Sequence, residues 1–188
     1  PKDNIERAIK KATDKDAGDF KELVYEGYAP GGVAVIVDCL TDNHNRSISD
    51  VRMVFDRNGG NMAGSGAVAR MFTRMAHFVI SGEWADEDKL MEIVLDAGAD
   101  DLSVEDGVAE VWADPSAFEA LVKLFEEKGI ATDEAEVVRR PEMTVELTDP
   151  KVASQVMRLV ERMEELDDVQ MVTANYTIAD AIADQIEE

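Results

Sequence analysis

Cysteine, histidine and aromatic residues are scarce in this sequence. Its 188 residues include one cysteine, Cys39, and two histidines, and aromatic residues make up 6% of the chain. A single cysteine excludes a disulfide within the chain and favours a reducing, cytoplasmic compartment. His44 and His77 cannot form a metal site by themselves, and no spacing of His, Cys and carboxylates suits zinc. We therefore predict that the protein uses neither a metal ion nor a cofactor.

Long hydrophobic runs and catalytic motifs are missing as well. No apolar stretch approaches the roughly 18 residues that span a membrane, and no signal peptide is visible, so we expect no membrane partner. The glycines at 59–60 and 64–66 form neither a GxGxxG motif nor a P-loop. Cys39 has no neighbouring base, and no pair of carboxylates stands out for acid–base catalysis. These absences predict a protein that is not an enzyme.

Positive charge is scarce in the second part of the chain. The formal net charge is −22, yet residues 1–77 hold 11 Lys/Arg and 11 Asp/Glu. Residues 78–188 hold 8 Lys/Arg and 30 Asp/Glu, so they carry the entire excess. Such an acidic body repels phosphate over about 8–10 Å. Contact with a polyanion is therefore expected in the first 77 residues or in a segment outside this chain, although a solvated acidic surface is the plainer interpretation.

The stretch 25–61 organises the chain. Its Pro30-Gly31-Gly32 turn joins a strand to an apolar, β-branched run that is typical of a buried strand, and a polar loop then opens a helix. Further strands and helices follow from hydrophobic periodicity and from turn residues. We expect helices at 1–12, 46–58, 86–97, 116–128 and 151–166, and strands at 20–28, 33–40, 68–80, 100–104, 108–113, 135–139, 143–147 and 169–175.

Three strand-to-helix junctions share one form. They read Leu-Thr-Asp at 40–42, Trp-Ala-Asp-Pro at 112–115 and Leu-Thr-Asp-Pro at 147–150. Asp can cap a helix and Pro suits its first position, so the repeat is explained by helix chemistry. Repeated strand–helix units with hairpins between them predict an α+β fold of two ferredoxin-like open-sheet domains. The elements of 81–140 close on themselves before Pro141, which predicts a domain inserted into the first.

Asparagine and arginine side chains gather after the buried strand. Arginine forks fit phosphate and asparagine can bind base edges or sugars, so we predict a nucleic-acid-binding surface. Arg46 falls in the first turn of its helix, where the helix dipole disfavours a cation, and this favours a specific partner. The alternative is a capped helix with an ordinary solvated face. The predicted site residues are Asn43, Asn45, Arg46, Arg52, Arg57 and Asn61, supported by Arg70, Arg74, Lys10 and Lys11.

Several stretches carry a resemblance to a known family. They are PKDNIERAIKKA at 1–12, YEGYAPGGVAVIV at 25–37, LTDNHNR at 40–46 with NGGN at 58–61, and, more loosely, LDDVQ at 166–170. With these motifs the chain resembles the YebC family, which includes the mitochondrial translational activator of cytochrome oxidase. The MAGSG stretch at 62–66 departs from the family pattern.

The resemblance implies a basic helical N-terminal domain, whose last helix matches residues 1–12, followed by two α+β domains. The resemblance implies that the protein has no enzyme activity. It also implies that the protein binds promoter DNA, or rRNA and tRNA on the ribosome. We expect this binding to need the N-terminal segment that family members have before residue 1.

We accordingly expect four parts. Residues 1–15 are a remnant N-terminal helix and linker, 16–80 plus 141–177 a central domain, 81–140 an inserted acidic domain, and 178–188 an acidic tail. The expected function is non-enzymatic regulation of gene expression, as a ribosome-associated translation factor or a DNA-binding transcriptional regulator. The alternative is a ferredoxin-like regulatory module that binds a small molecule or a partner protein between its domains.

Overall fold

The computed structural model describes residues 19–186 and divides them into two compact units. Unit 2 is Thr73–Arg140, and unit 1 takes the described residues up to Phe72 and from Pro141 onward. The boundary predicted from the sequence lies at residues 80–81. The structure places it earlier, because strand β4 (Phe72–Ser81) pairs with β6 (Val108–Ala113) inside unit 2. The predicted helix at 1–12 lies outside the described residues.

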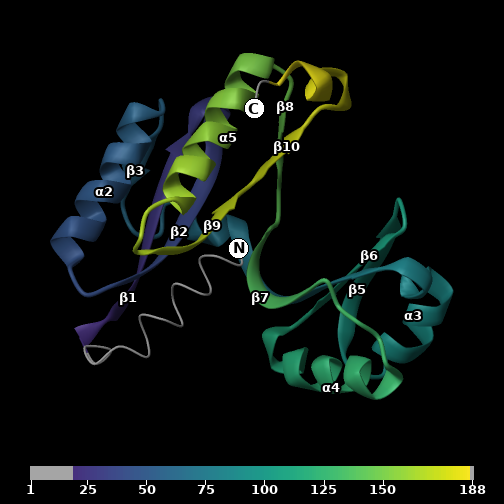
Figure 1. The fold of residues 1–188 in the computed structure, drawn as a ribbon. Coiled ribbons are helices and arrows are strands. Elements are labelled where there is room, and N and C mark those ends of the chain that lie inside the picture. Colours follow the sequence, from purple (N-terminus) through teal and green to yellow (C-terminus); the bar gives the residue numbers. More distant parts are fainter. Residues whose placement is uncertain (1–18, 187–188) are drawn as a thin grey trace. The chain divides into compact units, whose positions relative to one another are not determined.

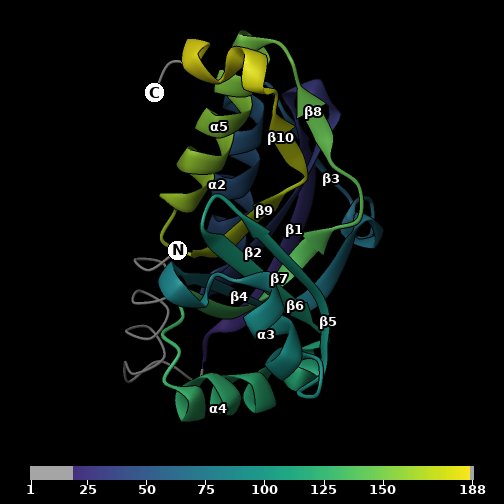
Figure 2. The same cartoon turned by 90° about the vertical axis from the view of Figure 1, so that its right-hand side faces the viewer.

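Unit 1 is built on an antiparallel sheet with the strand order β3-β1-β2-β9. Its helices α2 and α5 lie on one face of this sheet (Figures 1 and 2). The bounds are β1 Lys21–Ala29, β2 Val33–Thr41, α2 His44–Arg57, β3 Asn61–Ala63, α5 Pro150–Glu164 and β9 Val169–Ala174.

Strand β2 is buried on both of its faces. Val35 and Val37 pack in the core formed with α2 and α5, whereas Ala34 and Ile36 pack on the other side with Val68 and other residues of the 67–72 segment. That segment includes the short helix η3 (Ala69–Met71). Burial on two faces explains why the strand reads as a continuous apolar run.

Two glycines let neighbouring elements approach β1 closely. A Cβ on Gly27 would lie 2.6 Å from the ring of Phe55 and 2.6 Å from the carbonyl oxygen of Asn61. A Cβ on Gly60 would collide with the carbonyl oxygen of Tyr28. The YEGY and NGGN stretches of the sequence therefore meet where α2 and β3 pack on β1.

A second, two-stranded sheet completes unit 1. Strand β8 (Val145–Leu147) pairs in parallel with β10 (Tyr176–Ile178), and the short helix η6 (Asp180–Gln185) follows. The buried side chain of Asn175 accepts a hydrogen bond from the backbone N–H of Ala34 at 2.7 Å and donates one to the carbonyl oxygen of Met143 at 3.3 Å. Ile182 of η6 is buried in the core, so the predicted acidic tail contributes to packing as well as to charge.

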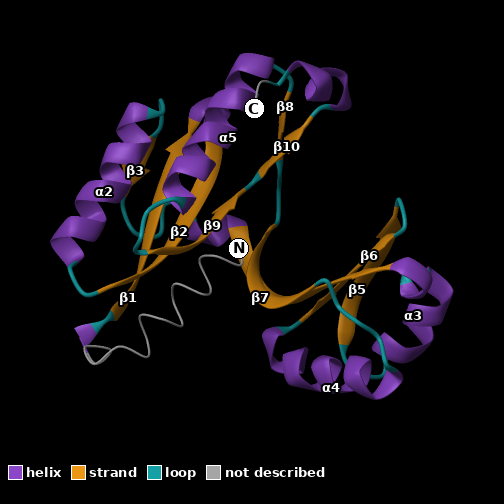
Figure 3. Ribbon diagram, viewed as in Figure 1, coloured by secondary structure: helices purple, strands orange, loops and turns teal. Residues whose placement is uncertain are grey.

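Unit 2 alternates strands and helices as β-α-β-β-α-β (Figure 3). Its strand order, β5-β6-β4-β7, is the ferredoxin-like arrangement. Its core includes Phe78, Leu90 and Phe125. Asp106 and Gly107 turn the β5–β6 hairpin with positive φ angles of 49° and 76°. The remaining bounds are η4 Gly82–Trp84, α3 Glu87–Val94, β5 Ala99–Glu105, η5 Pro115–Ala117, α4 Phe118–Lys128 and β7 Glu134–Pro141.

A polar and aromatic cluster lies among the alternate strand residues of unit 2 that do not join this core. His77 stacks on Trp112 with ring centroids 3.9 Å apart, and its Nε2 lies 2.7 Å from a carboxylate oxygen of Glu110. The guanidinium of Arg140 lies 4.4 Å from the centroid of Trp112 and 2.9 Å from Asp101. The cluster thus joins side chains from all four strands of the sheet.

The predicted α+β class with two open sheets is confirmed. The four-stranded sheet of unit 1 has a different strand order from the sheet of unit 2, because unit 1 begins with the β1–β2 hairpin around η2 (Pro30–Gly32). Helix α2 begins at His44, two residues before the predicted start, because Asn43 caps it. The strand expected at 68–80 begins only at Phe72, after the η3 turn.

Candidate nucleic-acid interface

The N-terminus of α2 is held by local hydrogen bonds that begin in β2. Asn43 is the N-cap, and its side-chain oxygen accepts the N–H of Arg46 at 3.0 Å. The hydroxyl of Thr41 accepts the N–H of Asn43, also at 3.0 Å. Such capping satisfies helix N–H groups that otherwise lack partners. The predicted site residue Asn43 therefore has a structural role in this conformation.

Arg46 is held by two carboxylates. Its Nη2 lies 2.8 Å from Asp42 and 3.0 Å from Asp168, and its Nε lies 3.3 Å from Asp168. The hydrogen bonds that Arg46 donates to Asp168, and next to Asp42, raise the pKa of Arg46, so the guanidinium stays charged. Asp168 is buried, so its carboxylate needs a positively charged partner. This need explains why a cation lies in the first turn of α2, and no ligand has to be invoked. The sequence argument for a partner at Arg46 therefore has a competing explanation inside the chain.

The outer face of α2 brings three predicted site residues together. Asn45, Arg52 and Arg57 line one shallow groove. No ion pair holds either arginine within residues 19–186. The other residues that line this groove are Ile48, Ser49, Met53 and Asp56.

The remaining predicted residues are spread over other elements. Asn61 is the exposed first residue of β3, and Arg70 is exposed in η3. Arg74 is exposed on β4 and so belongs to unit 2. Lys10 and Lys11 lie outside the described residues. The candidate interface therefore rests on Asn45, Arg52 and Arg57, the three that share a surface.

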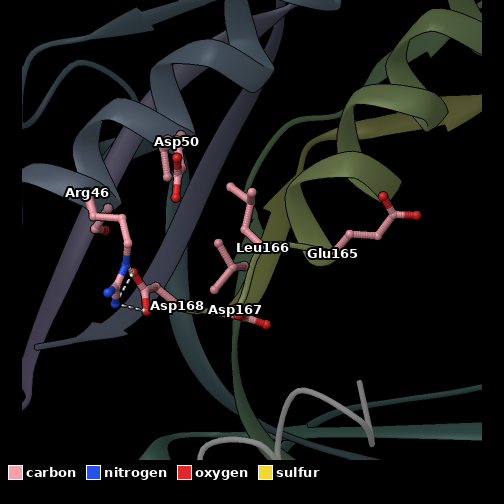
Figure 4. A pocket seen from close by; sticks show the side chains of 9 residues that line it. Arg46, Asp50, Glu165, Leu166, Asp167 and Asp168 are labelled. Carbon is pink, nitrogen blue, oxygen red and sulfur yellow. Dashed lines mark hydrogen bonds and ion pairs between the residues drawn. The ribbon is translucent and has the colours of Figure 1, made fainter. Parts of the chain in front are cut away.

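A pocket lies on another side of the α2 N-terminus, where two motifs of the sequence meet. The 166–170 motif contacts the 40–46 motif through the Arg46–Asp168 pair (Figure 4). The N–H of Leu40 also donates to the carbonyl oxygen of Asp168 at 2.8 Å. The pocket has a volume of about 270 Å³. The residues that line it are Arg46, Ser47, Asp50, Val51, Glu165, Leu166, Asp167, Asp168 and Val169.

Ser47 is the residue of this pocket that sequence reasoning missed. Its side chain is buried, and its hydroxyl finds no hydrogen-bond partner in the described part of the chain. A buried hydroxyl without a partner costs about 1–3 kcal/mol. Serine in a helix gives no signal in the sequence, so only the position of the α5–β9 loop reveals this group.

Other features limit the chemistry of the described residues. No group of three or more His, Cys, Asp and Glu side chains among them is arranged to hold a metal ion. The helices in this part of the chain are all too short or too polar to cross a membrane. Unit 2 is strongly acidic, since its sequence holds 18 Asp/Glu and 6 Lys/Arg.

These features define an α+β protein of two sheet-based units, one of them acidic, with a small cationic helix face on the other. The chain belongs to the TACO1/YebC family, because the model of the second and third domains of that family matches residues 20–176. The family suggested by the sequence motifs is thereby confirmed.

Named relatives cover almost the whole chain. A probable transcriptional regulatory protein of Syntrophobacter fumaroxidans is 47% identical over 99% of this chain and 75% of its own length. A second one, of Desulforapulum autotrophicum, is 45% identical over 98% of this chain and 74% of its own length. The crystal structure of a conserved hypothetical protein from Aquifex aeolicus matches with a TM-score of 0.80 and 38% identity, and covers 97% of this chain and 76% of that one.

Proposed function

We propose that this protein is a non-enzymatic regulator of gene expression that binds nucleic acid through the outer face of α2. The names of its relatives as probable transcriptional regulatory proteins support a regulatory role. The observation that carries the proposal is the pair Arg52 and Arg57, two exposed guanidinium groups without an ion pair in the described part of a chain of net charge −22. Unpaired arginines of this kind fit phosphate oxygens.

The same face offers groups that complement phosphate contacts. Asn45 and Ser49 supply hydrogen-bonding side chains beside the arginines, and Met53 supplies an exposed apolar contact. Asp56 lies among them and opposes binding to phosphate. A surface with both charges and an apolar group favours a local contact with folded RNA over a contact with a long row of phosphate groups.

We place the contact on ribosomal RNA in preference to promoter DNA. A helix that reads duplex DNA usually presents the side chains of its N-terminal turn to base edges. Here Asn43 caps that turn and Arg46 is tied to Asp42 and Asp168. The net charge of −22 also opposes a long DNA interface, because it repels phosphate. The ribosome offers local RNA sites together with basic proteins.

Ribosome co-sedimentation tests the proposal. The parent and the variant Arg52→Ala/Arg57→Ala are both joined to the N-terminal segment of the relatives, because binding is expected to need it. The variant should then bind roughly tenfold more weakly than the parent, a loss of about 1.4 kcal/mol. Raising the salt should weaken binding of the parent, with a log–log slope of about 0.7–0.9 per phosphate contacted. The matched control is Lys151→Ala/Arg158→Ala, which removes two exposed positive charges from α5 of the same unit.

The outcomes separate the proposal from its rivals. Equal losses in the two double variants would mean that net charge matters and the α2 face does not. Binding that stays constant as salt rises would favour a protein or small-molecule partner. A gel-shift assay with duplex DNA, run in parallel, decides between promoter DNA and the ribosome.

A further inference from the structure

The pocket beside the α2 N-terminus has a charge opposite to that of the proposed interface. Its lining residues carry four carboxylates, Asp50, Glu165, Asp167 and Asp168, against the single guanidinium of Arg46. That guanidinium is already bound by Asp168 and by Asp42. Phosphate is therefore repelled from this pocket, and a cation is attracted to it.

Asp50 is the carboxylate available to such a cation. It is half-buried on α2, and no ion pair or hydrogen bond holds its carboxylate in the described part of the chain. The carboxylate of Glu165 instead forms an ion pair with the guanidinium of Arg162 at 3.0 Å, and it points away from Arg46 (Figure 4). Asp50 and Leu166 lie on opposite walls, one from α2 and the other from the loop between α5 and β9 (Figure 4).

Ser47 provides the second polar group of the pocket. Its side chain is 1% exposed, and its hydroxyl has no hydrogen-bond partner among residues 19–186. Ser47 and Asp50 are three positions apart on α2, so they lie on one face of the helix. An N–H donor that enters the pocket can satisfy the hydroxyl and the carboxylate together.

The apolar walls and the size restrict the ligand further. Val51, Leu166 and Val169 line the pocket beside its polar groups, and such walls suit the aliphatic stem of a Lys or Arg side chain. The volume of about 270 Å³ is below the roughly 300–1,000 Å³ of typical small-molecule sites. The pocket is thus large enough for the end of one side chain, and further affinity must come from the surface around it.

We propose that this pocket binds a Lys or Arg side chain presented by a partner protein. The cationic group contacts Asp50 and the hydroxyl of Ser47, and its stem packs on Leu166. This site is separate from the outer face of α2, since the residues that line the two places are all different. It therefore does not depend on nucleic-acid binding.

NMR titration of the protein with small side-chain analogues tests the proposal. The probes are Nα-acetyl-lysine methylamide and its arginine counterpart, and the neutral control is Nα-acetyl-norleucine methylamide, which keeps the aliphatic stem. The cationic probes should give saturable shifts of the amide signals of Ser47, Asp50 and Leu166, with dissociation constants in about the millimolar range. Norleucine should give none.

Two variants and one matched control sharpen this test. Asp50→Asn should weaken binding of the cationic probes by about tenfold, the effect of losing one charge-assisted hydrogen bond. Asp56→Asn makes the same charge change on the outer face of α2 and should leave binding unaltered. Ser47→Ala should weaken binding while the protein stays as stable as the parent or becomes more stable, because it removes a buried hydroxyl that has no partner.

Three results would overturn the proposal. The first is the absence of saturable shifts, which would mean that water alone occupies the pocket. The second is an equal effect of Asp50→Asn and Asp56→Asn, which would mean that net charge explains the binding. The third is a response to spermidine but not to the lysine and arginine probes, which would assign the pocket to a free polyamine. Unaltered binding in Arg52→Ala/Arg57→Ala would show that this site and the α2 interface act separately.

Discussion

Arg46 is an exposed arginine that binds a buried carboxylate, that of Asp168. The Arg46 side chain is 46% exposed, but the carboxylate that it binds belongs to a side chain only 6% exposed. The hydroxyl of Thr41 also lies 3.0 Å from this carboxylate. From the sequence, Arg46 is predicted only as part of a nucleic-acid-binding surface. The structure instead connects it to a buried charge.

We predict that Arg46→Ala lowers the free energy of unfolding by about 1–2 kcal/mol, because it leaves a buried carboxylate less compensated. Arg158→Ala, which removes an exposed α5 arginine without an ion pair in the described part, should change it by less than about 0.5 kcal/mol. Urea unfolding followed by circular dichroism measures both. A loss for Arg46→Ala no larger than that of the control would show that the pair does not stabilise the fold.

Burial and a neighbouring carboxylate both act on the ionisation of Tyr176. Burial, and then the charge of Glu164, raise the pKa of Tyr176. We predict that Glu164→Gln lowers the pKa of Tyr176 towards the ordinary tyrosine value of about 10, because it removes a charge that disfavours tyrosinate. Titration of the Tyr176 ring signals by NMR measures the shift. Glu161→Gln, one turn earlier on α5, is the control, and an equal shift there would contradict the assignment to Glu164.

The sign of the linked stability follows from the direction of this shift. Since the pKa of Tyr176 is higher in the folded chain than in the unfolded chain, the protonated ring favours folding. This contribution is fully present below about pH 10 and is lost as the pH rises through the folded value. Tyr176→Phe should therefore reduce the loss of stability in alkaline solution.

At the scale of elements, Glu26 organises the segment that covers the second face of the sheet in unit 1. Its side chain is 4% exposed. Its carboxylate accepts three backbone N–H groups, from Gly66 at 2.6 Å, Val68 at 2.9 Å and Ala69 at 2.7 Å. Val68 in turn packs on Ala34 and Ile36 of β2. One carboxylate on β1 thus holds a loop whose glycine-rich sequence suggests only flexibility.

We predict that Glu26→Gln lowers the free energy of unfolding by about 1–3 kcal/mol, because an amide offers one acceptor oxygen where the carboxylate offers two. Hydrogen exchange at Gly66, Val68 and Ala69 should accelerate, and exchange in the β5–β6 hairpin should not. The control is Glu22→Gln, an exposed position on the same strand. Unaltered exchange at the three amides would mean that the loop is held by its apolar packing.

At the scale of the whole molecule, unit 2 has a hydrophobic core of its own. Phe78, Leu90, Val111, Leu121 and Phe125 are all buried in it. They come from β4, α3, β6 and α4, which all belong to one continuous stretch of chain. A continuous stretch with a closed core can fold as a domain.

We predict that a chain of residues 72–141 folds by itself with a stability of about 3–5 kcal/mol, which is typical of so small a core. Phe78→Ala should abolish the cooperative transition, since a buried phenylalanine contributes about 3–5 kcal/mol. Val108→Ala, at a position 39% exposed, should retain it. Thermal unfolding followed by circular dichroism decides. A parent chain without a cooperative transition would show that unit 2 depends on unit 1.

The sequence predicted what is encoded by neighbouring residues. The apolar run 33–40 and the capping Asp114 and Asp149 mark elements that the structure contains, whereas α2 is capped by Asn43 in place of Asp42. Periodicity and capping act over a few residues, so they can be recognised without the fold. The family motifs likewise identified the family, and Asn45 and Arg52, seven positions apart on one helix, fall on one face by their spacing alone.

By itself the sequence determined the α+β class, the position of most elements and the acidic character of the second part. Only the tertiary structure decided that β4 belongs to unit 2, that Arg46 binds Asp168, and that Ser47 lines a pocket. Arg46 and Asp168 are 122 positions apart, and the whole of unit 2 lies between them in the chain. Local patterns say nothing about such pairs, because their contact depends on the path of the chain through the sheet.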